Sequence, residues 1–201
     1  MRMTQLIQLS DSRQQILWQN FRQGDQLAFS QIFQFHYSYL YHYGIRLGAD
    51  KELAKDCIQE LFIHLWENRH RLSHTTSIKY YLMKCYRRKV GKLLGKQRTA
   101  NQALDDHYDF EIVFSPEAHF ITEETSLARQ TYLLEALDNL SKRQKEVIYL
   151  KFYSNLNYQE IADVMGLNYQ SIRNYAHQAI LTLRKKKAQL LISSDWLSYP
   201  G

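Results

Sequence analysis

The residues best suited to a chemical task in this sequence are the polar side chains within residues 169–178. Their amide, guanidinium, hydroxyl and imidazole groups can hydrogen-bond to base edges and phosphates in a DNA major groove. They are Gln170, Ser171, Arg173, Asn174, His177 and Gln178. Ile172, Ala176, Ala179 and Leu183 recur among them at helical intervals. We therefore expect one helix with an apolar side in a core and a polar side available to DNA.

The residues before this helix predict a helix-turn-helix. Ile161 and Val164 mark the apolar side of a short first helix, and Ala162 is small enough to let a second helix approach. Gly166 can adopt the left-handed conformation of a sharp turn, and Asn168 can cap the helix that follows. A structural helical hairpin also has a polar face, but the small residue, the glycine turn and the basic end of the second helix together favour DNA binding.

A second candidate surface lies on the predicted helix 51–68, whose opposite side is apolar. Its residues are Asp56, Gln59, Glu60 and Ile63. An isoleucine exposed among acidic groups is typical of a partner surface. Simple solvation of this polar side is the alternative.

A third candidate surface combines cations with aromatic rings on the predicted helix 77–96. Its residues are Tyr80, Lys84, Arg87 and Arg88. Lysine and arginine suit a nucleic-acid backbone, and Tyr80, Tyr81 or Tyr86 could stack on an unpaired base. Lys89 and Lys92 fall inside the apolar arc, so either the helix ends early or their stems follow the core with the amines in water. A solvated basic helix is the alternative.

The composition limits the class of protein. A chain of 201 residues fits one or two small domains. Its net charge of +6 is unevenly spread: residues 79–98 are basic, 105–124 are acidic and 142–187 are basic again. The two cysteines favour a reducing compartment, and neither a signal peptide nor a membrane span is present, which predicts a cytoplasmic protein without membrane insertion.

The sequence gives little support to an enzyme or a metal protein. His70 and His74 have a spacing seen in zinc sites, but neither paired cysteines nor a carboxylate cluster accompanies them. A glycine-rich phosphate loop, a nucleophile elbow and paired catalytic carboxylates are also missing from the sequence. We expect no catalytic residue, cofactor or metal.

Hydrophobic periodicity predicts an all-α fold of two small helical domains joined by an acidic flexible linker, with the helix-turn-helix at the C-terminal end. The expected helices are 13–22, 25–47, 51–68, 77–96, 126–137, 142–152, 158–165 and 169–191. The expected divisions are a first domain 1–98, a linker 99–124, a second domain 125–192 and a frayed tail 193–201. Five apolar residues are unusual in a flexible tether and could dock on a domain: Phe110, Ile112, Val113, Phe114 and Phe120.

Several segments resemble, in order, the parts of a bacterial RNA polymerase sigma factor of the extracytoplasmic-function (ECF) type. Gly24-Asp25 and Ala28-Phe29 resemble the opening of the first sigma domain. AKDCIQELF, from Ala54, resembles the signature that grips the polymerase core. KYYLMKCYRRKVGKLLGKQR resembles the helix that faces the minus-ten promoter element, and LSKRQKEVIYLKFYSNLNYQEIADVMG the start of the second domain. Arg88 stands where the family usually has asparagine, and Gln178 where it favours arginine.

The resemblance implies a function for each candidate surface. The surface around Asp56 would bind core RNA polymerase, the surface around Tyr80 the minus-ten element, and the polar side of the last helix the minus-thirty-five element. It further implies promoter melting, with a flipped base received by the loop 69–78, a linker threaded through the polymerase cleft, and an anti-sigma factor as a further partner. A helix-turn-helix regulator that acts without polymerase is the alternative, although such a regulator would not need Asp56, Gln59 and Glu60.

Overall fold

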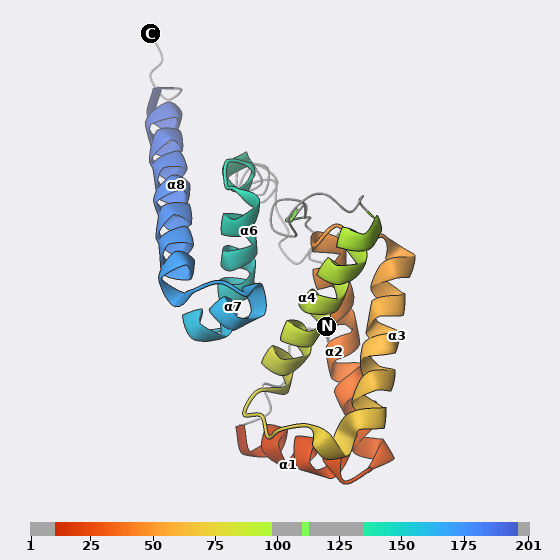
Figure 1. The fold of residues 1–201 in the computed structure, drawn as a ribbon. Helices are drawn as coiled ribbons and strands as arrows, with labels where there is room; N and C mark the ends of the chain where they lie inside the picture. Colours follow the sequence, from red (N-terminus) through yellow and green to blue (C-terminus); the bar gives the residue numbers. More distant parts are fainter. Residues whose placement is uncertain (1–10, 98–109, 113–134, 197–201) are drawn as a thin grey trace. The chain divides into compact units, whose positions relative to one another are not determined.

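The computed structural model describes residues 11–97, 110–112 and 135–196. The chain divides into two compact units, Met1–Tyr108 and Asp109–Gly201. Every regular element among the described residues is helical, which confirms the predicted all-α fold (Figure 1). None of the described helices combines the length and the apolar character needed to cross a membrane.

The described residues of unit 1 form four α-helices and one short 3-10 helix. They are α1 (Asp11–Arg22), α2 (Gln26–Arg46), α3 (Lys51–Asn68), η1 (Arg69–Arg71) and α4 (Ile78–Gln97). Aspartates start two of these helices, because their carboxylates accept hydrogen bonds from otherwise unpaired backbone amides. Asp25 accepts from Leu27 and Ala28, and Asp50 accepts from Leu53. Both caps fix where the chain turns between helices.

The core of unit 1 depends on a close approach of α2 and α4. Gly44 on α2 and Tyr86 on α4 are both buried, and the Tyr86 hydroxyl donates a 3.2 Å hydrogen bond to the Ala54 carbonyl oxygen of α3. A Cβ atom at Gly44 would overlap the Tyr86 hydroxyl and lie 3.0 Å from its Cζ. The missing side chain of Gly44 therefore makes room for a ring that connects three helices.

The helices of unit 2 whose full bounds lie within the described residues form the second set. They are α6 (Lys142–Ile148), the π-helix η3 (Tyr149–Tyr153), α7 (Tyr158–Met165) and α8 (Tyr169–Trp196). The Ser141 side chain accepts from the Gln144 amide, and the Gln144 side chain accepts from the Ser141 amide, which starts α6 with a capping box. The sequence predicted one α-helix over 142–152. In the structure the α-helix ends at Ile148, and the next five residues are π-helical. The backbone of α8 stays helical to Trp196, beyond the predicted start of the tail.

Part of the predicted linker packs in unit 2. Phe110 is 1% exposed, and its ring centroid lies 5.6 Å from that of Tyr149. Ile112 packs against Leu137 and Leu140. Burial of these apolar side chains outweighs the acidic, loop-like character of their neighbours. The rest of the predicted linker, residues 99–109 and 113–124, lies outside the described residues, as does most of the helix expected at 126–137.

We expect the contact between α2 and α4 to respond sharply to Gly44→Ala. The new methyl group would overlap the Tyr86 side chain, and overpacking of this kind destabilises a protein by about 1–3 kcal/mol. Gly91→Ala is the matched control, because a Cβ atom there meets no atom within 4 Å. It should stabilise α4 by about 0.5–1 kcal/mol through helix propensity. The free energy of unfolding from urea titration measures both, and equal effects would contradict the proposed packing constraint.

Candidate functional site

The turn between α7 and α8 has the geometry that a helix-turn-helix needs. Gly166 is left-handed, with φ 67° and ψ 30°, and the amides of Gly166 and Leu167 both donate to the Ala162 carbonyl oxygen. The Asn168 side chain then accepts a 2.7 Å hydrogen bond from the Ser171 amide and caps α8. The predicted turn and cap are therefore present, and together they fix the direction in which α8 leaves the turn.

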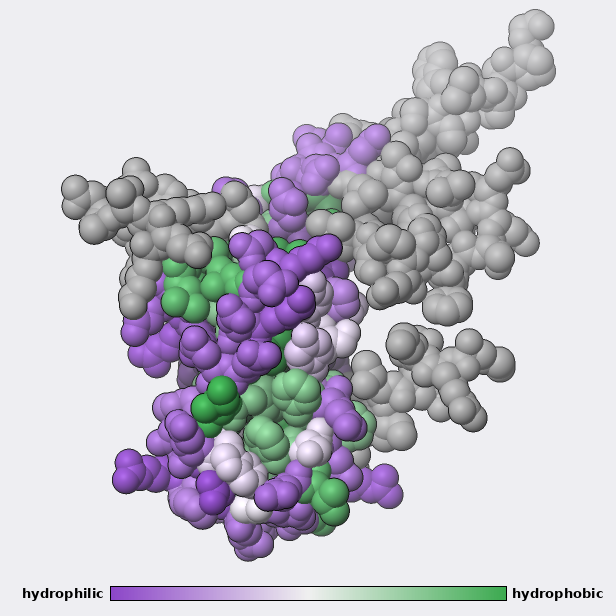
Figure 2. All heavy atoms as spheres, turned by 90° about the vertical axis from the view of Figure 1, so that its right-hand side faces the viewer, coloured by the Kyte–Doolittle hydropathy of each residue, from purple (hydrophilic) through white to green (hydrophobic). Residues whose placement is uncertain are grey.

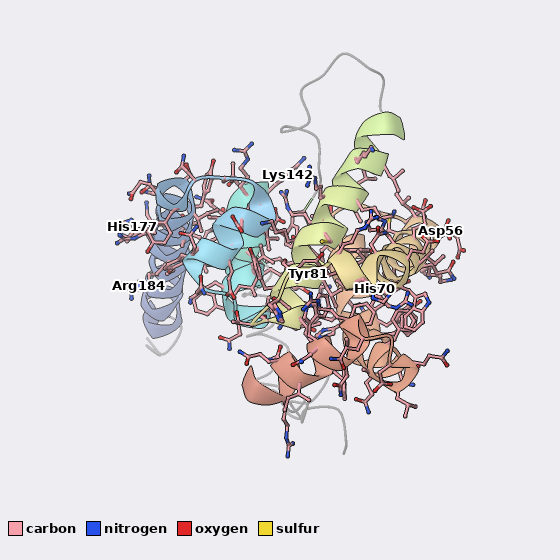
Figure 3. The ribbon with its side chains drawn as sticks, turned by 60° about the horizontal axis from the view of Figure 1, so that its bottom comes forward. Asp56, His70, Tyr81, Lys142, His177 and Arg184 are labelled. Atoms are coloured by element: carbon pink, nitrogen blue, oxygen red, sulfur yellow. The ribbon has the colours of Figure 1, made fainter. Side chains whose placement is uncertain are left out.

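The polar side of α8 faces solvent. The opposite side of α8 is buried: its residues Ile172, Ala176 and Ala179 are at most 2% exposed. Five of the six predicted DNA-binding residues are exposed, namely Gln170, Arg173, Asn174, His177 and Gln178. Ser171 is half-buried. Figure 3 shows His177 and Arg184 on the side of α8 that points away from α6 and α7.

Local contacts orient the first turns of this surface. The Gln170 side-chain amide donates a 3.1 Å hydrogen bond to the Asn174 amide oxygen, and the Arg173 guanidinium lies 6.0 Å from the centroid of the Tyr169 ring. Arg184 is exposed two helical turns beyond His177 and extends the polar side. Arg184 was not among the DNA-binding residues predicted from the sequence, although its spacing of seven residues from His177 places it on the same helix face.

The second candidate surface lies on the outer side of α3. All four of its predicted residues are exposed, and Ile63 is 57% exposed. Cys57, Ile58 and Leu61 hold the opposite side of α3 in the core. Figure 2 looks onto this side of the molecule and shows hydrophobic side chains gathered between hydrophilic ones, and Figure 3 shows Asp56 on the outside of α3. A mixed acidic and apolar surface of this kind suits a protein partner.

An ion pair joins this surface to α4. The Lys89 ammonium lies 2.6 Å from a Glu60 carboxylate oxygen. The hydrogen bond from Lys89 and the positive charge of Lys89 lower the pKa of Glu60 below its usual value. This contact explains why Lys89 falls inside the apolar arc of α4: the helix does not end early, and the amine reaches the edge of the core to meet Glu60. Sequence reasoning missed the pair, because nothing in the spacing aligns α3 with α4.

The third candidate surface lies on α4. Lys84 and Arg88 are exposed, whereas Tyr80 and Arg87 are half-buried. The Lys84 amine lies 5.9 Å from the centroid of the Tyr80 ring, so one cation and one ring stand side by side. Lys79, which was not in the predicted set, lies 4.1 Å from the centroid of the Tyr39 ring on α2. This helix side thus combines positive charge with aromatic surface.

Only one of the three tyrosines proposed for base stacking keeps that possibility without rearrangement of the core. Tyr86 is fully buried, and the suggestion that it could stack is wrong. The Tyr81 ring packs 5.1 Å from the Trp18 ring, and burial raises the pKa of Tyr81 to about 12. The rings of Tyr81 and Tyr86 both pack in the core, because α4 carries aromatic residues on more than one of its sides. Tyr80 is the remaining candidate.

The loop between α3 and α4 lies next to these surfaces in unit 1. His70, Arg71, Ser73 and His74 are exposed there. The two histidines do not form part of a metal cluster, since no three histidine, cysteine, aspartate or glutamate side chains within the described part of the chain could hold a metal ion. His74 instead contacts the Arg22 guanidinium.

The comparisons with known proteins cover both units. The family model "Sigma-70 region 2" matches residues 32–99, and the model "Sigma-70, region 4" matches residues 130–183. The chain is 22% identical over 160 residues to the ECF RNA polymerase sigma factor SigX of Bacillus subtilis, covering 79% of this chain and 82% of that protein. It is 23% identical over 165 residues to the ECF sigma factor SigK of Mycolicibacterium vanbaalenii, covering 81% and 83%.

Solved structures agree at the level of the fold. CnrH, in complex with the cytosolic domain of CnrY, has a TM-score of 0.55 and 18% identity, and covers 90% of this chain and 97% of its own. The sigma factor RpoE of Bartonella quintana, in complex with the anti-sigma factor NepR, has a TM-score of 0.56 and 20% identity, and covers 80% and 96%. With both sigma-70 regions matched in the expected order, this chain belongs to the RNA polymerase sigma factors of the ECF type.

Proposed function

We propose that this protein is a dissociable specificity subunit of bacterial RNA polymerase. Unit 1 binds the core enzyme through Asp56, Gln59, Glu60 and Ile63 and meets the minus-ten element through α4. Unit 2 binds the minus-thirty-five element through α8. The protein makes and breaks no covalent bond, and it acts in the cytoplasm, where polymerase and promoters are found.

The observation that best supports this proposal is the exposed polar side of α8 behind a capped, left-handed turn. A helix held in this way can enter a major groove with its first turns towards base edges. Arg173 and Asn174 provide the groups that bind guanine and adenine edges, and His177 extends the contact by one turn. Arg184 and Lys185, exposed further along α8, add affinity for phosphates.

Promoter opening fits the side of α4 that carries Tyr80 and Lys84. Initial duplex binding is dominated by phosphate neutralisation, whereas an opened strand also rewards stacking on an aromatic ring. A base turned out of the minus-ten strand would enter the loop 69–78, where capture offsets an unstacking cost of a few kcal/mol. The exposed cations of this helix side would hold the strand while the base is captured.

An anti-sigma factor is the third partner in this proposal. The RpoE structure to which this chain is similar contains such a factor. The partly apolar surface on α3 is one that an inhibitor could cover, and covering it would keep the protein from polymerase. Run-off transcription with core polymerase and a genomic promoter library tests the proposal as a whole. A stand-alone regulator would bind its promoters equally well without polymerase.

The first functional prediction concerns the surface on α3. Changing Gln59 and Glu60 to Ala should abolish binding to core polymerase while leaving the fold intact, because both side chains are exposed. Since Glu60 also pairs with Lys89, the single variant Gln59→Ala isolates partner binding from that ion pair. Gln34→Ala, at an exposed position of α2, is the matched control. Copurification of the double variant with core polymerase at wild-type levels would contradict the assignment.

The second prediction concerns α8. Arg173→Ala, Asn174→Ala and His177→Ala should each relax preference at one position of the minus-thirty-five element, at a cost of about 1–3 kcal/mol per lost base contact. Transcription from promoters with a randomised upstream element measures this preference. Gln159→Ala, exposed on α7, removes a polar side chain outside the predicted set and should leave the preference unchanged. Unchanged preference in all three α8 variants would exclude this helix as the source of specificity.

The third prediction separates opening from docking. Tyr80→Ala should leave the closed complex nearly intact but reduce permanganate-reactive open complex, since stacking is worth roughly 1–3 kcal/mol per base. Tyr80→Phe keeps the ring and should retain opening, and a template already melted over the minus-ten region should restore transcription by Tyr80→Ala.

Lys84→Ala and Arg87→Ala should instead weaken both steps, most strongly at low salt, and should reduce the salt dependence of binding, because each removes a charge that displaces counterions. If all three alanine substitutions left opening, salt dependence and transcript yield unchanged on a duplex promoter, this side of α4 would be merely solvated.

A further inference from the structure

The conformation of the loop between α3 and α4 depends on contacts with another helix. The loop consists of η1 and residues 72–77, and most of its side chains face solvent. Its internal hydrogen bonds are short-range, such as those between Thr75 and Ser77. Exposed segments with so few contacts of their own open easily unless another element restrains them.

The restraint comes from α1. The Trp18 indole Nε1 donates a 2.9 Å hydrogen bond to the Ser73 carbonyl oxygen, and the Arg22 Nη1 atom lies 3.0 Å from Nε2 of His74. The same Nη1 atom lies 3.4 Å from Nδ1, and because arginine has only donors, a ring nitrogen of His74 accepts this hydrogen bond. At the end of the loop, the Ile78 amide donates a 3.3 Å hydrogen bond to the Gln14 side chain. Figure 1 shows the loop, in yellow, passing along α1 before it enters α4.

The donor on Trp18 is itself fixed. Trp18 is 1% exposed, and its ring centroid lies 5.2 Å from that of Phe21 and 5.1 Å from that of Tyr81. Tyr81 belongs to α4, so the same indole joins α1 to the loop backbone and to the helix that follows the loop. Helix α1 lies outside residues 32–99, the part that the region 2 model matches.

We propose that α1 positions the loop for capture of the flipped minus-ten base, with Trp18 and Arg22 as positioning residues. This inference rests on the proposed function of unit 1. A loop ordered before the DNA arrives does not lose conformational entropy when the base enters, so preorganisation strengthens capture of the correct base. Neither Trp18 nor Arg22 needs to touch DNA for this effect.

Two test variants, one conservative variant and one control test the proposal in the full-length protein. Arg22→Met removes the donor to His74 but keeps an unbranched stem, and Arg22→Lys keeps a cation that can donate. Arg13→Met makes the same change at an exposed position of the same helix. Trp18→Phe removes the indole N–H but also changes buried packing, so Arg22→Met keeps the test decisive if Trp18→Phe unfolds.

The first measurement is amide hydrogen exchange in the free protein, which needs no polymerase. Amides of residues 72–78 should exchange about fivefold faster in Arg22→Met and Trp18→Phe, as expected for loss of one hydrogen bond. Arg22→Lys should recover part of the protection, and Arg13→Met should match the wild type. Unchanged exchange in both test variants, or equal acceleration in Arg13→Met, would overturn the proposal.

The second measurement is base preference of the holoenzyme on templates already melted over the minus-ten region. Preference at a single position, that of the captured base, should fall roughly fivefold or more. Core binding and preference in the minus-thirty-five element should stay unchanged. Faster exchange with unaltered preference would mean that the contacts of α1 are only structural, and would also overturn the proposal. A wild-type holoenzyme without promoter-dependent transcription would contradict the proposed function instead, and the exchange comparison would still decide whether α1 holds the loop.

Discussion

The close contact between Gly44 and Tyr86 fixes the arrangement of unit 1. The ring of Tyr86 fits against a helix that has no side chain at that point, and its hydroxyl reaches the backbone of α3. Because a buried hydroxyl without a partner would be costly, this one hydrogen bond also sets the spacing of α3 and α4. The outer sides of both helices are thereby determined. The surfaces around Asp56 and Tyr80 are the sides that this contact leaves to solvent.

The helical periods in the sequence were sufficient to predict which sides of α3 and α8 are exposed. Apolar residues such as Ile58 and Ile172 recur at intervals that leave little choice of core side. The glycine turn at Gly166 was predictable for a similar reason, since few residues adopt its left-handed conformation. These features depend on local spacing alone, so one sequence is enough to find them.

Contacts between helices could not be predicted in the same way. Lys89 meets Glu60, and Trp18 meets Ser73, only because helices distant in the sequence pack side by side. Tyr86 has the same polar and aromatic character as Tyr80, and the sequence does not say which of the two rings is buried. Phe110 lies in an acidic stretch typical of a tether, yet it packs on Tyr149, because one buried ring can outweigh several solvated neighbours.

The division between core and surface explains how the proposed recognition could change without loss of the fold. The exposed residues of α3, α4 and α8 stand on sides opposite the buried ones, so substitutions there should have small effects on stability. Glu60 is a partial exception, but its own side chain is 60% exposed in the ion pair with Lys89, and an ion pair in such contact with solvent contributes little to stability. The loop 69–77 differs, because its restraint includes the buried Trp18. Its conformation is therefore coupled to the core, whereas the chemistry of its exposed side chains remains free to vary.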